Sequence, residues 1–247
     1  MSDYPAALIP VDHIEPVPRR VRGMIDGRIV VDTTSALYLW EWSPYPQWYI
    51  PVADIEPGLL VDAGTSEQTS RGTARVHSVA GRADAARVYG AGPVEGRVRF
   101  QWSAMDSWFE EDEEVFVHPR SPYARVDAIR SGRTVRVELD AVLLAESSST
   151  VMVFETGLPT RYYFPRTEVD FTALEPTDTV SSCPYKGTTG QYWSVRTPRG
   201  TYADYAWAYD FPTRQLLPIT GLVAFYNEKV DISIDGEPVP RPTTHFS

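Results

Sequence analysis

Residues 26–51 read DGRIVVDTTSALYLWEWSPYPQWYIP, and residues 140–165 read DAVLLAESSSTVMVFETGLPTRYYFP. The second stretch aligns with the first without a gap, so that Trp48-Tyr49-Ile50-Pro51 falls on Tyr162-Tyr163-Phe164-Pro165. With small insertions the match continues through Phe100 on Phe225 to residues 106–109 on residues 231–234. Solenoid repeats are only about 20–50 residues long, so a period this long indicates a duplicated domain.

The repeat predicts the domain organisation. We place the boundary between the copies near residue 120, in the stretch His118-Pro119-Arg120-Ser121-Pro122. Residues 19–120 are then a degenerate first copy, and residues 121–247 are a better-kept second copy. Residues 1–18 contain four prolines and are predicted to be an extended tail along a domain surface.

The local patterns predict a mainly β protein with little helix. Residues 133–139 and 230–234 alternate polar and apolar side chains, as half-buried strands do, and residues 142–145 and 151–154 are typical of more buried strands. Asp26-Gly27 and Asp235-Gly236 carry the signal of a tight hairpin. For residues 35–42 and their counterpart we expect a short helical turn.

Composition excludes several function classes. The chain has 23 Lys+Arg against 33 Asp+Glu and a net charge of −10, which disfavours binding to nucleic acid or to an anionic membrane. A single cysteine rules out an intrachain disulfide and makes a structural zinc site improbable. No long apolar run and no secretory signal is visible. We therefore expect an acidic, cytoplasmic protein without a metal or a cofactor.

Several motifs in the second copy resemble the family called domain of unknown function 427. They are Glu155–Pro165, Cys183–Gly187, Tyr192–Val195, Ala206–Tyr209 and Gly221–Tyr226. The resemblance covers residues 121–247 well and residues 19–120 as a worn copy. It implies a small domain of the β-tent kind, similar to methionine sulfoxide reductase B and to the thalidomide-binding domain of cereblon, with no established activity. The magnesium-binding Gly-Ser and paired-aspartate pattern of nucleotidyltransferases is missing from the sequence, as is a phosphate-cradling glycine loop.

The lone thiol, Cys183, lies in Cys183-Pro184-Tyr185-Lys186-Gly187. A nearby ammonium such as that of Lys186 would favour the reactive thiolate, so Cys183 is a candidate nucleophile. Buried structural packing is the competing interpretation. Gln68-Thr69-Ser70-Arg71-Gly72 takes the equivalent place in the first copy, which keeps the glycine and a positive charge but not the thiol.

Glu155 follows an aromatic residue in an apolar strand, as Glu41 does in the first copy. A buried carboxylate needs a partner, and we consider Arg161, Lys186 and backbone amides at the strand end. Glu155 is also a candidate general acid or base. The second copy is rich in aromatic residues, which either fill its core or line a pocket for a planar or cationic ligand. The predicted ligand-binding set is Lys186, Arg161, Tyr163, Tyr185, Trp193 and Trp207.

Two functions are compatible with these patterns. The first is binding of a small molecule of unknown identity in the second domain, with possible enzymatic action through Cys183 and Glu155 and an anion clamp of Lys186 or Arg161. The second is a non-catalytic protein-interaction module that presents the acidic run of residues 110–114. An internally duplicated chain can bury the surface that a single-copy relative would use to dimerise, so we expect a monomer.

Overall fold

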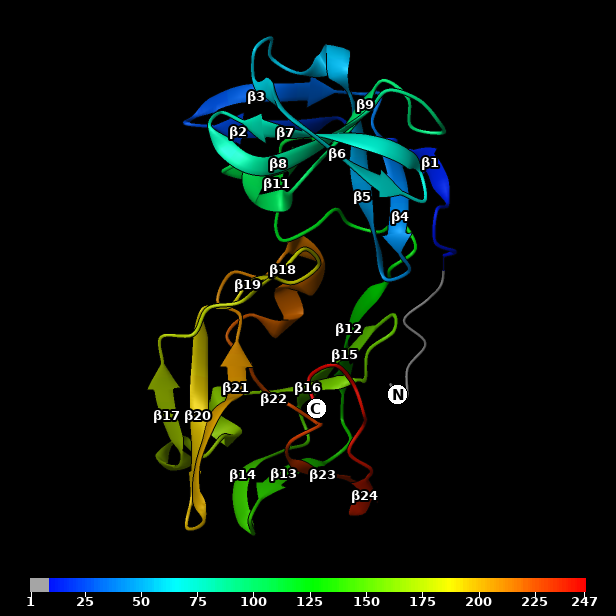
Figure 1. Cartoon of the computed structure of the whole chain (residues 1–247). Helices are drawn as coiled ribbons and strands as arrows, with labels where there is room; N and C mark the ends of the chain where they lie inside the picture. The colour runs from blue at the N-terminus through cyan, green and yellow to red at the C-terminus, as the bar shows by residue number, and fades with distance from the viewer. Residues whose placement is uncertain (1–8) are drawn as a thin grey trace. The chain divides into compact units, whose positions relative to one another are not determined.

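The computed structural model describes residues 9–247 and divides the chain into two compact units. One unit extends to Pro122, and the other contains Tyr123–Ser247. Both are built almost entirely of strands, with short 3-10 helices between them (Figure 1). The expected mainly β fold with two tandem domains is therefore confirmed.

The first domain contains one large and one small antiparallel sheet. The large sheet has, in spatial order, β1 (Ile14–Pro16), β4 (Leu37–Trp42), β5 (Tyr45–Pro51), β9 (Arg97–Phe100), β8 (Arg82–Tyr89), β7 (Gly72–Val79) and β6 (Leu60–Thr69). The small sheet has β11 (Glu113–Val115), β10 (Ser107–Glu110), β2 (Val21–Ile25) and β3 (Arg28–Thr33). Two short helices, η1 (Val52–Asp54) and η2 (Trp102–Ala104), lie in the connections.

The second domain repeats this arrangement. Its large sheet has β12 (Val126–Ser131), β15 (Thr150–Glu155), β16 (Arg161–Phe164), β22 (Val223–Phe225), β21 (Gly200–Ala208), β20 (Gln191–Thr197) and β17 (Leu174–Thr177). Its small sheet has β14 (Val142–Ser147), β13 (Val135–Leu139), β23 (Asp231–Ile234) and β24 (Glu237–Val239). The connections hold η3 (Arg166–Glu168), η4 (Phe171–Ala173) and η5 (Arg214–Ile219).

The two domains share more than their strand order. The ladder β2–β3 shifts register after Gly23, and the ladder β13–β14 shifts after Val137, the aligned residue. Both predicted Asp-Gly hairpins are present, with positive φ at Asp26 and Asp235 and at the glycine that follows each. The second domain differs in the connection between β17 and β20, which forms a separate hairpin of β18 (Ser182–Cys183) and β19 (Gly187–Thr188) where the first domain extends β6 and β7 to their turn.

Each domain buries a core to which both of its sheets contribute. In the second domain, Val135 and Val137 of the small sheet belong to the same buried cluster as Phe164 and Phe225 of the large sheet. Side chains alternate along a strand, so the strand neighbours of Phe164 and Phe225 point to the opposite face of the large sheet, away from the small sheet. That outer face carries a second buried cluster, which includes Tyr163, Tyr192, Trp207, Tyr209, Leu216 and Ile219.

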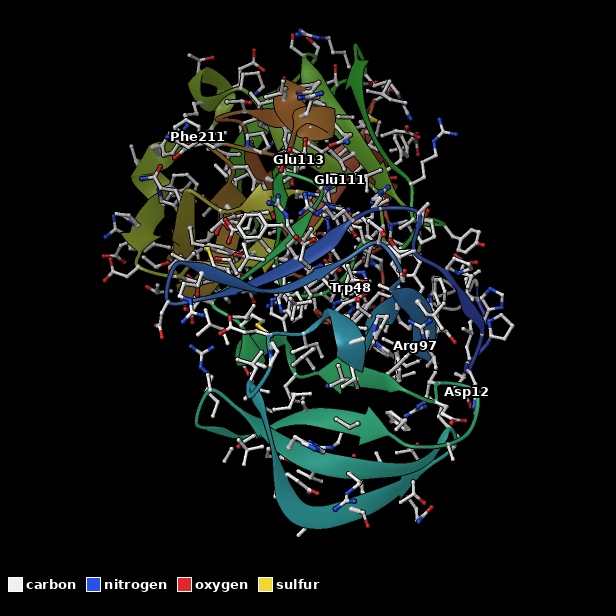
Figure 2. The ribbon with its side chains drawn as sticks, turned by 90° about the horizontal axis from the view of Figure 1, so that it is seen from above. Asp12, Trp48, Arg97, Glu111, Glu113 and Phe211 are labelled. Atoms are coloured by element: carbon white, nitrogen blue, oxygen red, sulfur yellow. The ribbon has the colours of Figure 1, made fainter. Side chains whose placement is uncertain are left out.

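The outer face of the second domain is buried because chain segments cover it. Leu216 and Ile219 of η5 are fully buried against it. The β18–β19 hairpin is fastened to the start of this segment, since the Thr213 amide donates to the Lys186 carbonyl at 3.1 Å (Figure 1, yellow beside orange). Phe211, in the same connection, is 90% exposed (labelled in Figure 2).

Three local expectations can be compared with the structure. Residues 37–42 form strand β4 rather than a helical turn, because they pair with both β1 and β5. Residues 1–8 of the expected tail lie outside the described residues, but residues 14–16 are an edge strand of the first domain's large sheet. Most of the acidic run is a solvated turn, since Glu111–Glu114 are exposed and residues 111–112 form the turn between β10 and β11, whereas Glu110 is 3% exposed and accepts from Arg19 Nη1 at 2.5 Å.

Candidate functional site

Five polar side chains of the second domain gather on the outer face of its large sheet. Glu155 ends β15, and Tyr163 lies on β16. Tyr209 follows β21, and Cys183 and Lys186 come from the β18–β19 hairpin that covers the sheet. These side chains are close enough for their charges to shift the pKa values of Tyr163, Lys186 and Tyr209. We call these five residues the outer-face cluster.

The Lys186 ammonium donates to Glu155 Oε2, and the two side chains are 11% and 9% exposed. Burial acts to lower the pKa of Lys186, but the charge of Glu155 raises it, with smaller contributions from Cys183 and Tyr163, and the net pKa lies above the ordinary value. Lys186 is therefore a cation at neutral pH. Of the partners considered for the Glu155 carboxylate, the structure shows Lys186.

Two tyrosines complete the polar surroundings of Lys186. Burial raises the pKa of Tyr163 to about 12, although Lys186 acts in the opposite direction. Burial also raises the pKa of Tyr209 well above its ordinary value. Trp207 Nε1 donates to the Tyr163 hydroxyl at 3.2 Å. Both phenols are thus neutral at physiological pH and are available as hydrogen-bond donors or acceptors.

The turn that carries Lys186 depends on Gly187, whose φ is +95°. The aligned Gly72 of the first copy has a φ of +115°, so the shared glycine serves a shared backbone conformation. The turn is fixed from the other side by Thr213, whose hydroxyl donates to the Tyr185 carbonyl at 2.6 Å. The predicted permissive role of Gly187 is confirmed.

Gly187→Ala is expected to lower the free energy of unfolding of the second domain by about 1–2 kcal/mol, because a side chain is unfavourable at this φ. A Cβ there would also lie 3.3 Å from the Phe211 carbonyl oxygen. Urea denaturation measures the loss. Gly236→Ala is the control, since Gly236 also has a positive φ but nothing within 4 Å of its Cβ. Equal losses in the two variants would show that the contact with Phe211 is unimportant.

Cys183 and Tyr185 are the half-buried members of this region, whereas Lys186, Tyr163 and Trp207 are buried. Cys183 lies close enough to Lys186 for its charge to influence that ammonium. Cys183 as a residue is therefore more exposed than Lys186, Tyr163 and Tyr209 of the outer-face cluster. The structure brings together the predicted residues Cys183, Glu155, Lys186, Tyr163 and Trp207, with Tyr185 in the covering turn.

Arg161 takes a different partner from the one considered for it. Its guanidinium forms a two-pronged ion pair with Glu228, with Nη1–Oε2 at 2.5 Å and Nη2–Oε1 at 2.7 Å. Three aromatic rings surround the guanidinium, with centroids at 5.5–5.9 Å, namely Trp207, Tyr226 and Phe246. Arg161 thus occupies an aromatic cage itself and is not a free anion clamp.

Trp193 lies apart from the other predicted residues. It belongs to the buried cluster between the two sheets, where its ring meets Phe171 edge to face at 5.7 Å. Its strand neighbour Tyr192 points to the outer face, where its hydroxyl bonds to Ser181 Oγ at 2.8 Å. Alternation along β20 explains the separation, because adjacent residues of a strand face opposite sides.

The first domain keeps a version of the outer-face cluster. Tyr49, aligned with Tyr163, donates from its hydroxyl to Glu41 Oε1 at 2.9 Å. Arg99 pairs with both oxygens of Glu41, at 3.1 and 3.2 Å. Arg71, aligned with Lys186, is near enough for Tyr49 and Glu41 to raise its pKa against the lowering effect of burial. Both domains therefore place a tyrosine and a cation beside the aligned carboxylate.

Two residues that lie beside the predicted site residues could not be assigned from the sequence patterns. Tyr209 was counted only among the aromatics, and its place beside Cys183 depends on the end of β21. Glu228 was not considered as the partner of Arg161, although an arginine in an apolar strand predicts a buried acid elsewhere. No group of three potential metal ligands occurs among residues 9–247. Within the same range, no helix is long and apolar enough to span a membrane.

A search of curated proteins returned no match. The model of one family, described as a domain of unknown function (DUF427), matches residues 13–111 and again residues 127–236. The two matched ranges fall one in each compact unit and together cover most of the chain. The chain therefore belongs to the DUF427 family, as a member with two tandem copies of the domain.

Proposed function

We propose that the second domain binds a small organic anion at the outer-face cluster, with Lys186 as the counter-charge and Cys183 at the entrance. The observation that supports the proposal is the buried Lys186–Glu155 pair, covered by the β18–β19 hairpin. A buried ion pair stabilises a fold little better than apolar side chains of similar volume would. Structural need alone is thus a weak reason for placing charge there.

The chemistry of the neighbours suits such a ligand. An incoming carboxylate or similar group competes with Glu155 for the Lys186 ammonium, and the hydroxyls of Tyr163 and Tyr209 supply neutral hydrogen bonds. Trp207 offers an aromatic surface at the side of Tyr163. If the domain is an enzyme, the Cys183 thiol is the nucleophile and Glu155 the acid or base that the sequence predicted.

A screen of anionic metabolites by thermal shift tests this function, with alkylation of the lone thiol as a second readout. A ligand that binds the native state is expected to raise the melting temperature and to slow alkylation of Cys183 by iodoacetamide, followed by mass spectrometry. Glu155→Gln/Lys186→Met, which leaves no unpaired charge, is expected to lose both effects. The control Arg75→Met removes an exposed, ion-paired arginine of the first domain and is expected to keep both.

Two outcomes would contradict the proposal. Cys183 that resists alkylation until the protein unfolds has a buried structural role. Ligands that protect the double variant as well as the unaltered protein bind elsewhere. A screen without any ligand favours the alternative, a non-catalytic interaction module, for which the exposed side chain of Phe211 is the structural support.

A further inference from the structure

The outer face of the first domain carries an unusual concentration of arginine. Arg87 on β8 and Arg99 on β9 are directly opposite each other in the antiparallel ladder. Arg71 comes from the turn between β6 and β7 and lies near Tyr49, the tyrosine opposite Arg99. The side chains of Arg71, Arg87 and Arg99 are only 13%, 12% and 17% exposed. We call these three residues the arginine cluster.

Like charges directly opposite each other on neighbouring strands destabilise a sheet. The second domain has the same ladder but avoids this cost, since Trp207 and Ala224 form the aligned cross-strand pair. The fold therefore does not require two arginines at these positions. An anion that bridges the two guanidiniums would convert their repulsion into attraction.

The present partners of the arginine cluster are mostly loosely held. Arg71 pairs with Asp12, Arg87 with Glu67 and Asp84, and Arg99 with Glu41. Asp12, Glu67 and Asp84 have side chains 40%, 45% and 70% exposed, so solvent competes for them and they can turn away at small cost. Only Glu41, at 22%, is mainly covered.

Donor capacity remains on this face. Arg71 Nε is buried without a hydrogen-bond partner among the residues that the structure describes. Arg97, two residues before Arg99 on the same face of β9, donates to the backbone carbonyls of Ser35 and Tyr49 rather than to a carboxylate (labelled in Figure 2). Guanidinium groups bind tetrahedral oxyanions through two parallel hydrogen bonds, so several arginines on one face suit an anion with many acceptor oxygens.

We propose that the arginine cluster of the first domain is a binding site for a phosphate group, either free or esterified to a small molecule. The phosphate oxygens would accept from Arg87 and Arg99 and from the free Nε of Arg71, while Asp12, Glu67 and Asp84 turn to solvent. This site is separate from the one proposed for the second domain, and it uses arginine where that domain uses lysine and aromatic rings.

Isothermal titration of the full chain with inorganic phosphate, glycerol 2-phosphate and succinate, at matched ionic strength, tests the proposal. At least one phosphate compound is expected to bind more tightly than succinate. Arg87→Gln and Arg99→Gln are each expected to weaken phosphate binding about tenfold or more, because each removes charge-assisted hydrogen bonds. Arg75→Gln is the control, since Arg75 on β7 is also ion-paired but faces the other way along its strand and is 63% exposed.

The titrations identify the ligand class or overturn the proposed phosphate site. Binding of the ester but not of free phosphate identifies the ligand as a phosphorylated small molecule, and binding of both admits either. Absence of phosphate binding, preference for succinate, or an equal loss in Arg75→Gln overturns the proposal. Circular dichroism melting of each variant separates lost binding from lost folding. The double variant Glu155→Gln/Lys186→Met is expected to bind phosphate normally, so the two proposed sites can fail independently.

Discussion

Arg161→Met is expected to lower the free energy of unfolding of the second domain by about 3–5 kcal/mol. The substitution leaves Glu228 as an unpaired carboxylate whose side chain is 0% exposed in the folded protein. It also removes the guanidinium from its cage of three aromatic rings. Guanidinium denaturation followed by tryptophan fluorescence measures the loss, because Trp207 lies against the substituted side chain.

A matched control separates burial from charge. Arg166 pairs with Asp210 at 3.7 Å, with both side chains more than 40% exposed, so Arg166→Met is expected to cost less than about 1 kcal/mol. The double variant Arg161→Met/Glu228→Gln is expected to recover part of the loss, because no charge remains buried. A cost for Arg161→Met no larger than that for Arg166→Met would refute the importance of the buried pair.

The Arg161–Glu228 ion pair makes the stability of the second domain depend on pH in the acidic range. Burial acts to raise the pKa of Glu228, but the hydrogen bonds from Arg161 and Thr244 lower it below its ordinary value. A carboxyl with a depressed pKa stabilises the folded state above its unfolded pKa, and this contribution is lost as the pH falls through the folded value. The advantage of the unaltered protein over Arg161→Met/Glu228→Gln is therefore expected to shrink below about pH 4.

Lys186→Met is expected to destabilise the second domain by a similar amount, about 3–5 kcal/mol, because it strands the Glu155 carboxylate at 9% exposure. Adding Glu155→Gln to this variant is expected to restore most of the loss. Chemical denaturation of the single and double variants completes a double-mutant cycle. Strictly additive losses would show that the two side chains do not interact.

Alkali provides an independent check on Lys186. The pKa of Lys186 is raised in the folded protein, chiefly by Glu155 acting against burial. A group with a raised pKa contributes stability that is complete below its unfolded value and is lost only as the pH rises through the folded value. The difference in unfolding free energy between the unaltered protein and the double variant is thus expected to stay constant from neutral pH to about pH 10.

Much of the fold was predictable because it depends on repetition and alternation. The gapless match of residues 26–51 to residues 140–165 predicted that the two domains have the same strand order, as they do. Both Asp-Gly pairs form hairpin turns, because these residues tolerate the positive φ that such turns need. The helical turn expected at residues 35–42 failed for a physical reason. These residues are apolar and aromatic on both sides because β4 is a central strand, and a short apolar run has no clear period.

The candidate site was predictable in part. Lys186, Glu155 and Cys183 lie close together, as their residue types suggested. Their proximity depends on how the β18–β19 hairpin folds over the sheet, which the sequence does not specify. The error over Trp193 had a different origin. Sequence identifies an aromatic residue but not the side of the sheet to which it points, and a β-bulge between Trp193 and Val195 obscures the register further. Arg161 could not be paired from sequence because Glu228 is remote along the chain.

The strand order common to both domains has a consequence for how this family can change. In each domain the residues between the two sheets decide the fold, whereas the residues on the outer face of the large sheet point away from that interior. Substitutions on the outer face therefore leave the strand register intact, as the replacement of a tryptophan and alanine pair by two arginines shows. The same strand order can thus carry different side-chain chemistry on its outer face, at a cost in stability rather than in fold.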